Sequence, residues 1–259
     1  MPALSLKPGL RVLVTAGASG IGRAIADLLI ENGASVHICD VSRENLDDFR
    51  KAHPDHGSSL CDVADEQDVA SLFKDVHQGL GGLDALVNNA GIAGPTGGVE
   101  HISPTEWRRT IDVGLTGQFL CTHHAVPLLK EVEAGAIINL SSAAGRFGYA
   151  FRTPYAAAKW GVIGFTQSLA KELGPAGIRV NAVLPGAVSG PRMQGVIRNR
   201  AIQLGISEAE MESEILEHIS LRRMAKAEDI AAMVLFLLGP GGFNISGQSL
   251  SVDGNTEAI

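Results

Sequence analysis

Short runs of β-branched and apolar residues alternate with amphipathic stretches along most of this chain. The runs predict strands at residues 11–15, 35–40, 58–63, 83–89, 136–142, 178–184 and 248–254. The stretches between them predict helices at 21–32, 43–53, 66–80, within 103–131, and at 154–173 and 227–238. Such alternation is typical of a parallel sheet built with right-handed crossovers.

No composition break resembles a linker, and no repeat of fixed period interrupts the pattern. We therefore expect an α/β fold with one domain over residues 1–259, a doubly wound, Rossmann-like parallel sheet of about seven strands with helices on both faces. Only the segment at about 187–222 departs from the alternation, as an irregular helical stretch. There Met211, Ile215 and Ile219 recur every four residues beneath five glutamates. This pattern predicts a flap over the carboxyl edge of the sheet, although a surface helical hairpin would explain it equally well.

Composition and charge exclude several classes of protein. Hydrophobic residues make up 45% of the chain and charged residues 19%, which is typical of a globular protein. The net charge of −7 offers no positive field for nucleic acid. The longest apolar run, at 230–238, has nine residues where a membrane helix needs ~20. Pro2 and Pro8 interrupt any apolar signal segment, and the three cysteines show no CxxC spacing. We therefore expect no membrane or nucleic-acid partner and a cytoplasmic location.

A glycine-containing turn follows the first predicted strand and leads into a helix. Gly20 and Gly22 would let backbone amides and the positive start of the helix approach a pyrophosphate, although such turns also serve packing alone. The next strand ends in Asp40, eighteen residues after Gly22, where a carboxylate can bind both ribose hydroxyls of a dinucleotide. Asp40 could instead cap a helix or end a solvated strand.

These residues favour NAD over NADP. The Asp40 carboxylate would repel the extra phosphate of NADP, and Ser19 in the turn is not basic. Arg43 lies close enough in sequence to weaken that repulsion. The preference for NAD is therefore not absolute.

Three residues suggest acid–base chemistry. Tyr155 and Lys159 are four residues apart in a predicted helix, and Ser142 ends the strand thirteen residues before Tyr155. A phenol with a pKa near 10 is a poor base at neutral pH, but a neighbouring ammonium lowers that pKa. The Ser142 hydroxyl could hold a substrate oxygen during proton exchange. A lone Tyr–Lys pair is more often a solvated helix face, and only the conjunction with Ser142 favours a site.

The chain resembles the short-chain dehydrogenase/reductase family over nearly its whole length. The motifs that carry the resemblance occur in the family's order: TAGASGIG, Asp62-Val63, Asn88-Asn89-Ala90-Gly91, Ser142, Tyr155-Ala-Ala-Ala-Lys159, Pro185-Gly186 and Ser251-Val252-Asp253-Gly254. The resemblance implies an oxidoreductase that uses NAD, or less readily NADP, on a small-molecule alcohol or ketone. It also implies a homotetramer built on the long helices and the C-terminal strand.

The resemblance implies a role for each matching residue. Tyr155 would be the general acid/base, Ser142 would orient the substrate oxygen, and Lys159 would bind the nicotinamide ribose and tune Tyr155. The implied cofactor-binding residues are Thr15, Gly17, Ser19, Gly20, Ile21, Gly22, Asp40, Asp62, Val63, Asn89, Ala90, Gly91, Tyr155, Lys159, Pro185, Gly186, Val188 and Ser189.

Two positions depart from the family pattern. Ala16 stands where the family usually has glycine, and a positive φ there would cost ~1 kcal/mol or more. Gly114 stands where the family commonly has an asparagine that helps to hold a water leading protons to the lysine. Gln118, one helical turn further on, or a second water could compensate. The alternative is a cofactor-binding protein with weak or no catalysis; a methyltransferase is disfavoured by Ser142, Tyr155 and Lys159.

Other features suggest weaker hypotheses. The segment between Ser142 and Tyr155 would place a substrate wall at the sheet edge, although each of its residues could equally belong to an exposed loop. Arg192 is a candidate clamp for a carboxylate or phosphate of the substrate. The His53/His56 and His123/His124 pairs lack a third ligand at zinc-site spacing, so we expect no metal. The candidate wall residues are Arg146, Phe147, Tyr149, Phe151 and Arg152.

Overall fold

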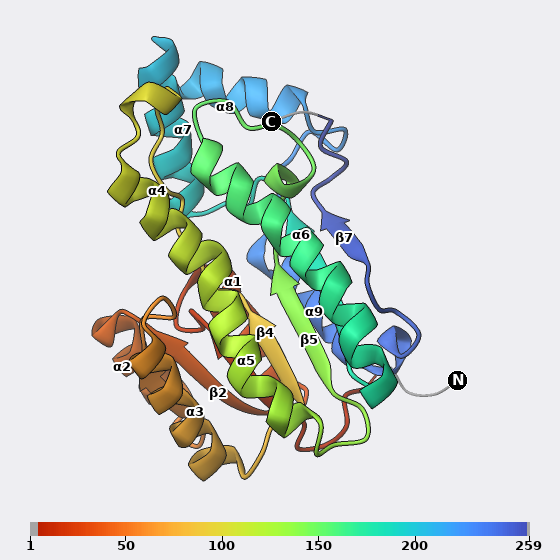
Figure 1. The fold of residues 1–259 in the computed structure, drawn as a ribbon. Helices are drawn as coiled ribbons and strands as arrows, with labels where there is room; N and C mark the ends of the chain where they lie inside the picture. Colours follow the sequence, from red (N-terminus) through yellow and green to blue (C-terminus); the bar gives the residue numbers. More distant parts are fainter. Residues whose placement is uncertain (1–4, 258–259) are drawn as a thin grey trace.

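The computed structural model describes residues 5–257 and contains a seven-stranded parallel sheet (Figure 1). The strand order is β3-β2-β1-β4-β5-β6-β7, so the predicted doubly wound sheet is confirmed. The order reverses between β1 and β4, and this creates a crevice at the carboxyl ends of the strands. The strands are β1 (Arg11–Thr15), β2 (Ser35–Asp40), β3 (Gly57–Leu60), β4 (Ala85–Asn88), β5 (Ala136–Leu140), β6 (Arg179–Pro185) and β7 (Ser249–Val252).

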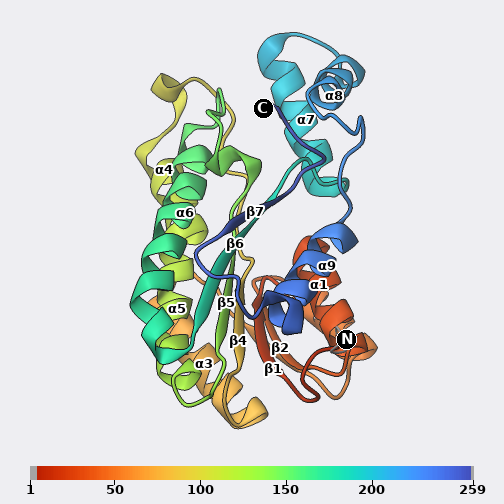
Figure 2. The same cartoon turned by 90° about the vertical axis from the view of Figure 1, so that its right-hand side faces the viewer.

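Helices cover both faces of the sheet (Figure 2). One face packs against α1, α2 and α9, and the other against α3, α5 and α6. Because neighbouring side chains of a strand point to opposite faces, Val12 and Val14 contact the first set while Leu13 contacts the second. The helices are α1 (Gly20–Glu31), α2 (Arg43–Ala52), α3 (Glu66–Leu80), α4 (Pro104–Ile111), α5 (Gly117–Leu129), α6 (Thr153–Leu173), α7 (Pro191–Leu204), α8 (Glu208–Glu217) and α9 (Ala227–Leu238). Shorter turns are η1 (Val99–His101), the π-helical η2 (Asp112–Thr116), η3 (Ala143–Gly145), η4 (Gly174–Ala176) and η5 (Pro240–Gly242).

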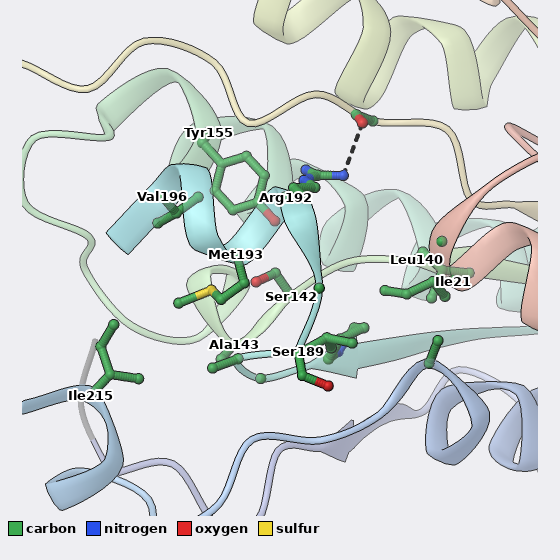
Figure 3. Close-up of a pocket in the computed structure, with 18 of the residues that line it drawn as sticks. Ile21, Leu140, Ser142, Ala143, Tyr155, Ser189, Arg192, Met193, Val196 and Ile215 are labelled. Atoms are coloured by element: carbon green, nitrogen blue, oxygen red, sulfur yellow. Dashed lines mark hydrogen bonds between the residues drawn. The ribbon is translucent and has the colours of Figure 1, made fainter. Parts of the chain in front are cut away.

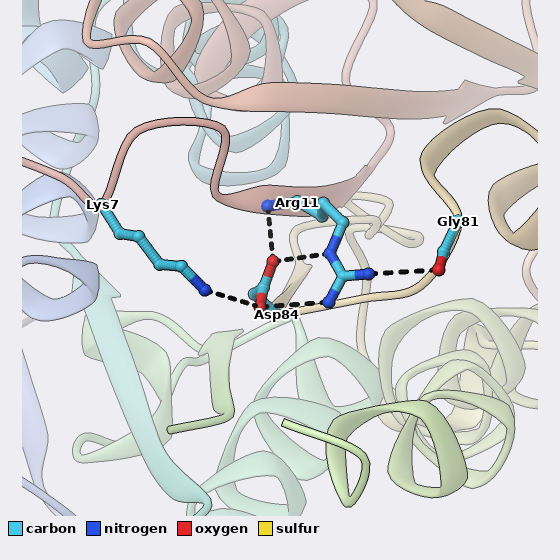
Figure 4. Close-up of polar contacts among 4 residues, drawn as sticks. All are labelled: Lys7, Arg11, Gly81 and Asp84. Carbon is cyan, nitrogen blue, oxygen red and sulfur yellow. Dashed lines mark hydrogen bonds and ion pairs between the residues drawn. The ribbon is translucent and has the colours of Figure 1, made fainter. Parts of the chain in front are cut away.

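A buried carboxylate fixes the amino-terminal edge of the sheet (Figure 4). Asp84 accepts hydrogen bonds from the backbone amide of Arg11 at 2.9 Å and from its Nε at 2.8 Å, and Lys7 Nζ lies 3.8 Å away. Burial opposes ionisation of Asp84, but the Arg11 contacts outweigh it and hold the pKa of the carboxyl below its usual range. The ion pair joins the start of β1 to the turn before β4.

Some element limits differ from those predicted. The third strand ends at Leu60 rather than at 63, and the Asp62 side chain then accepts a hydrogen bond from the Ala64 amide at 3.0 Å to form a turn. The irregular stretch after 190 is two regular helices, and Ser207 and Glu210 form a capping box at the start of α8. The sequence S-E-A-E contained that signal.

Within residues 5–257, no helix has both the length and the apolar character needed to cross a membrane. The predicted domain limits at 1 and 259, and Pro2, lie outside the described residues.

Candidate active site

A cavity of about 690 Å³ lies at the carboxyl ends of β1, β4, β5 and β6 (Figure 3). Residues of α7 and α8, which lie beyond this edge of the sheet (Figure 2), form part of its wall. The glycine turn and the Ser142–Tyr155 region line the same cavity. The predicted site residues that line it are Ser19, Gly20, Ile21, Gly22, Asn89, Gly91, Ser142, Tyr155, Lys159, Pro185, Gly186, Val188 and Ser189.

The remaining predicted residues lie behind or beside the wall. The Thr15 hydroxyl accepts hydrogen bonds from the Asn89 and Ala90 amides, both at 3.0 Å, and so fixes the loop after β4. The Asp40 carboxylate is buried beside the glycine turn and accepts a hydrogen bond from the Ala18 amide at 3.3 Å. Direct contact of these side chains with a cofactor stays a prediction.

Three further predicted cofactor residues have structural contacts of their own. Asp62 forms an ion pair with Arg109 at 2.8 Å, and Val63 is buried. A Cβ at Gly17 would lie 2.6 Å from Ile38, so glycine is needed there for the turn to pack on β2. A contact between Asp62 and an adenine also stays a prediction.

The turn between β1 and α1 has the shape that a phosphate site requires. Ala16 has φ +49° and Gly20 has φ +53°, so the strain anticipated at Ala16 is present. The side-chain amide of Asn89 donates to the Ala16 carbonyl at 3.1 Å and holds the turn. Ser19 makes no side-chain cap, which leaves the first amides of α1 open toward a ligand, and the turn fits a dinucleotide pyrophosphate. Ala16 itself lines the cavity, a contact that the sequence reasoning missed.

Ser142, Tyr155 and Lys159 meet on one side of the cavity. Tyr155 points its hydroxyl into the cavity on the side of Ser142 (Figure 3). Lys159 is buried one turn along α6, with Nζ 5.8 Å from the centre of the Tyr155 ring. Its ammonium donates to the Leu140 carbonyl at 2.8 Å, so the end of β5 fixes the position of the charge.

The electrostatics of this group favour a reactive phenol. Burial alone would raise the pKa of Tyr155, but the positive charges of Lys159, Arg192 and Arg152 and the Ser142 hydroxyl lower the pKa to about 8. Burial also lowers the pKa of Lys159. A phenol with such a pKa can exchange protons near neutral pH.

Gly114 lies in the π-helical turn η2, where it packs against α6. A Cβ at Gly114 would lie 3.2 Å from the Ala158 Cβ, so a side chain at this position would be crowded. The amide of Gln118, one turn further on, is buried and donates to the Leu140 carbonyl at 3.2 Å. Gln118 and Lys159 therefore share one acceptor, and the buried Gln118 Oε1 atom has no hydrogen-bond partner among residues 5–257.

Only part of the candidate substrate wall lines the cavity. Tyr149 and Arg152 do so, whereas Arg146, Phe147 and Phe151 are absent from its lining. Arg146 instead donates hydrogen bonds to β7. Two of the five candidate wall residues therefore line the cavity, a distinction that the sequence alone did not make.

Two arginines of α7 complete the polar part of the wall. Arg192 Nη1 donates to the Gly91 carbonyl at 3.0 Å and links the start of α7 to the loop after β4 (Figure 3). Its predicted role as a clamp for a substrate anion stays a prediction. Arg200 also lines the cavity, although the sequence reasoning did not assign it to the site. The sequence feature that could have indicated Arg200 is its four-residue spacing from Val196 in α7, because both residues then lie on one helix face and line the cavity.

Comparison with known proteins identifies the family. A family model described as enoyl-(acyl carrier protein) reductase matches residues 15–255. Cis-4-hydroxycyclohexanecarboxylate dehydrogenase of Sinomonas cyclohexanicum is 38% identical over 251 residues, which are 95% of this chain and 96% of that protein. The chain belongs to the short-chain dehydrogenase/reductase family.

Solved structures in this family share the fold and differ in cofactor. An NAD⁺-bound xylitol dehydrogenase superposes with a TM-score of 0.91 at 27% identity, covering 95% of this chain and 98% of that one. An actinorhodin polyketide ketoreductase variant with NADPH has a TM-score of 0.90 at 32% identity, covering 97% and 98%. Members of this short-chain dehydrogenase/reductase family use nicotinamide cofactors, and both NAD and NADP occur among them.

Proposed function

We propose that this chain is an NAD-preferring dehydrogenase that interconverts a secondary alcohol and a ketone, with Tyr155 as general acid/base. The observation that carries the proposal is the position of Tyr155. Its phenol, with a pKa lowered to about 8, lies beside Ser142 in the cavity that also contains the glycine turn.

The chemistry is divided between the protein and its cofactor. A bound nicotinamide supplies or accepts the hydride. Tyr155 takes the hydroxyl proton of an alcohol or returns it to a ketone, and Ser142 hydrogen-bonds to the same substrate oxygen. Lys159 stabilises the phenolate by its charge and would bind the nicotinamide ribose.

The preference for NAD rests on Asp40. Its carboxylate is buried beside the glycine turn, where the ribose of a dinucleotide would lie if its pyrophosphate occupied the start of α1. The 2′-phosphate of NADP would bring more negative charge to this position.

Spectrophotometric assays test the activity and the cofactor preference together. A panel of secondary alcohols is oxidised with NAD and separately with NADP, and formation of reduced nicotinamide is followed by its absorbance. Because one relative is named for a hydroxycyclohexane substrate, the panel includes ring alcohols. We expect turnover with NAD, and loss of turnover in Tyr155→Phe without loss of NADH binding. Binding of NADH with no turnover of any alcohol or ketone would overturn the proposal.

Gly114 is the argument for the alternative, a cofactor-binding protein with little turnover. Gln118 argues against that alternative, because its amide occupies the carbonyl that Lys159 also uses. We propose that Gln118 provides a polar group beside the lysine that Gly114 lacks. Measurable oxidation of an alcohol by the wild-type protein would therefore favour the dehydrogenase over the cofactor-binding protein.

We also propose that the chain forms a homotetramer and that residues 187–222 act as a substrate flap. Large aromatic side chains on α4, α5 and α6 are exposed, with exposed fractions of 39% for Trp107, 49% for Phe119 and 51% for Trp160. Such a surface is typical of a subunit interface. Light scattering coupled to size exclusion measures the assembly, and a monomeric mass at micromolar concentration would contradict it.

A further inference from the structure

Two arginines in the cavity lack the partner that buried arginines ordinarily have. Arg152 is 4% exposed and Arg200 is 9% exposed, and within the described part of the chain the buried Nε atom of each has no hydrogen-bond partner. Among residues 5–257 neither guanidinium forms an ion pair with a carboxylate. Arg11 shows the usual arrangement in this same protein, with Asp84 opposite its guanidinium (Figure 4). A buried charge without a counter-ion is costly, so its retention suggests that a ligand supplies the counter-ion.

Aromatic rings hold the two guanidinium groups in place. Arg152 lies over the Tyr155 ring at 4.5 Å and over the Tyr149 ring at 4.8 Å, and it also donates to the Ala93 carbonyl. Arg200 lies 5.2 Å from the centre of the Tyr149 ring. Stacking fixes a guanidinium but does not neutralise it, and the contacts of Arg152 and Arg200 within the described residues are rings and a carbonyl rather than a carboxylate.

Both arginines line the cavity that contains Tyr155. The stack Tyr155–Arg152–Tyr149–Arg200 therefore leads from the reacting phenol to a positive wall. Apolar side chains of the flap, including those of Val196 and Met211, line the same space. A substrate with an alcohol at one end and an anionic group at the other matches this distribution of polarity.

We propose that Arg152 and Arg200 form an anion subsite that binds a carboxylate group of the substrate. The inference rests on the proposed dehydrogenase function and narrows its substrate to a secondary hydroxy or keto acid. A carboxylate is favoured over a phosphate because Glu214 of α8 also lines the cavity and would repel a dianion more strongly than a monoanion. Bidentate pairing with a guanidinium also suits a planar carboxylate.

Binding is measured by calorimetry on the full chain with NADH present, so the result does not depend on turnover. The probes are cyclohexanecarboxylate, its neutral carboxamide and cyclohexyl phosphate. We expect the wild type to bind the carboxylate roughly 10- to 100-fold more tightly than the carboxamide, which is the effect of a hydrogen bond to a charged group. Equal affinities, or tighter binding of the phosphate, would overturn the proposal.

Variants assign that selectivity to Arg200, which does not contact Tyr155 directly. We expect Arg200→Met to reduce the ratio of carboxylate to carboxamide affinity to about one, and Arg200→Lys to retain part of it. The matched control is Arg198→Met, because Arg198 lies on the same helix but is exposed and pairs with Glu208. Retained selectivity in Arg200→Met, with cooperative thermal unfolding as evidence of folding, would refute the assignment.

Kinetics then separate the subsite from the proposed function. The matched substrates are 4-hydroxycyclohexanecarboxylate and 4-hydroxycyclohexanecarboxamide, each as cis and trans isomers. We expect the carboxylate to have the higher kcat/KM, chiefly through a lower KM, and Arg200→Met to remove this advantage. If calorimetry shows carboxylate selectivity but neither these nor other alcohols turn over, the dehydrogenase proposal fails while the subsite stands. If the carboxamide turns over as efficiently as the carboxylate, the subsite fails while the dehydrogenase stands.

Discussion

The lowered pKa of Tyr155 can be measured directly because the chain has only two tyrosines. In Tyr149→Phe the remaining phenol is that of Tyr155, and the phenylalanine ring still offers Arg152 and Arg200 a surface on which to stack. Titration of this variant, followed by the ultraviolet absorbance of tyrosinate, should give a midpoint at about 8.

The magnitude follows from the charges around the phenol. A pKa of about 8 instead of the ordinary value near 10 corresponds to about 3 kcal/mol in favour of the phenolate. At pH 7 roughly a tenth of the molecules would carry the phenolate, against roughly a thousandth for an unperturbed tyrosine. Lys159 is the largest contributor to this lowering. Adding Lys159→Met removes the ammonium while the ring keeps its partly buried position, so the midpoint should rise by about one unit or more.

If Tyr155 is the general acid/base, as proposed, the same ionisation should set the pH dependence of the reaction in each direction. Alcohol oxidation needs the phenolate of Tyr155 and should accelerate as pH rises through about 8, whereas ketone reduction needs the phenol and should slow over the same range. Stopped-flow single turnovers with saturating cofactor measure both directions. A midpoint at or above 10 in Tyr149→Phe, or one that Lys159→Met leaves unchanged, would refute this electrostatic account.

Three further outcomes test separate parts of the structure. Asp84→Asn should lower the free energy of unfolding by ~1–3 kcal/mol at pH 7. Because Arg11 lowers the folded pKa of Asp84, the difference between wild type and variant should shrink as pH falls below about 4. Thermal melts that differ equally at pH 7 and pH 3 would contradict this account. Gln118→Leu should reduce kcat about tenfold or more and shift the pH profile of kcat, whereas the affinity for NADH, measured by fluorescence, should change little. An unchanged kcat would exclude the proposed compensation of Gly114 by Gln118. Asp40→Asn, which keeps an acceptor for the backbone but removes the charge, should raise the ratio of NADPH to NADH affinity by about tenfold, and an unchanged ratio would show that Asp40 does not select the cofactor.

The sheet, and the grouping of Ser142, Tyr155 and Lys159 in one cavity, could be predicted because their signals are local. A run of apolar residues followed by a glycine turn fixes both β1 and the start of α1, and the four-residue spacing of Tyr155 and Lys159 places them on one helix face. Strand ends were less certain, because they depend on turn contacts such as the bond between Asp62 and the Ala64 amide. The stretch after 190 was predicted as irregularly helical, and its division into the two regular helices α7 and α8 was missed although Ser207 carried a capping signal.

The details of the site depended on contacts between distant segments. The crowding of a side chain at Gly114 arises from Ala158, which lies on a different helix. The bond between Gln118 and the Leu140 carbonyl requires the fold to bring the start of α5 beside the end of β5. Spacing indicated that Gln118 could compensate for Gly114, but only the packed structure shows which acceptor it reaches.

The cavity wall formed by Arg152 and Arg200 shows that a protein with a negative net charge can contain a site that favours an anion. The chain carries a net charge of −7, yet Arg152 and Arg200 are buried in a cavity, whereas α8 presents glutamates to solvent. Solvent-exposed charges are screened over about 8–10 Å at physiological salt, and buried charges act through a medium of lower dielectric. An anion that enters the cavity therefore interacts mainly with the two buried guanidinium groups. An acidic surface therefore argues against a polyanionic partner but is consistent with a small carboxylate substrate. A polyanion would meet the exposed glutamates, whereas a small anion inside the cavity meets the two buried guanidinium groups.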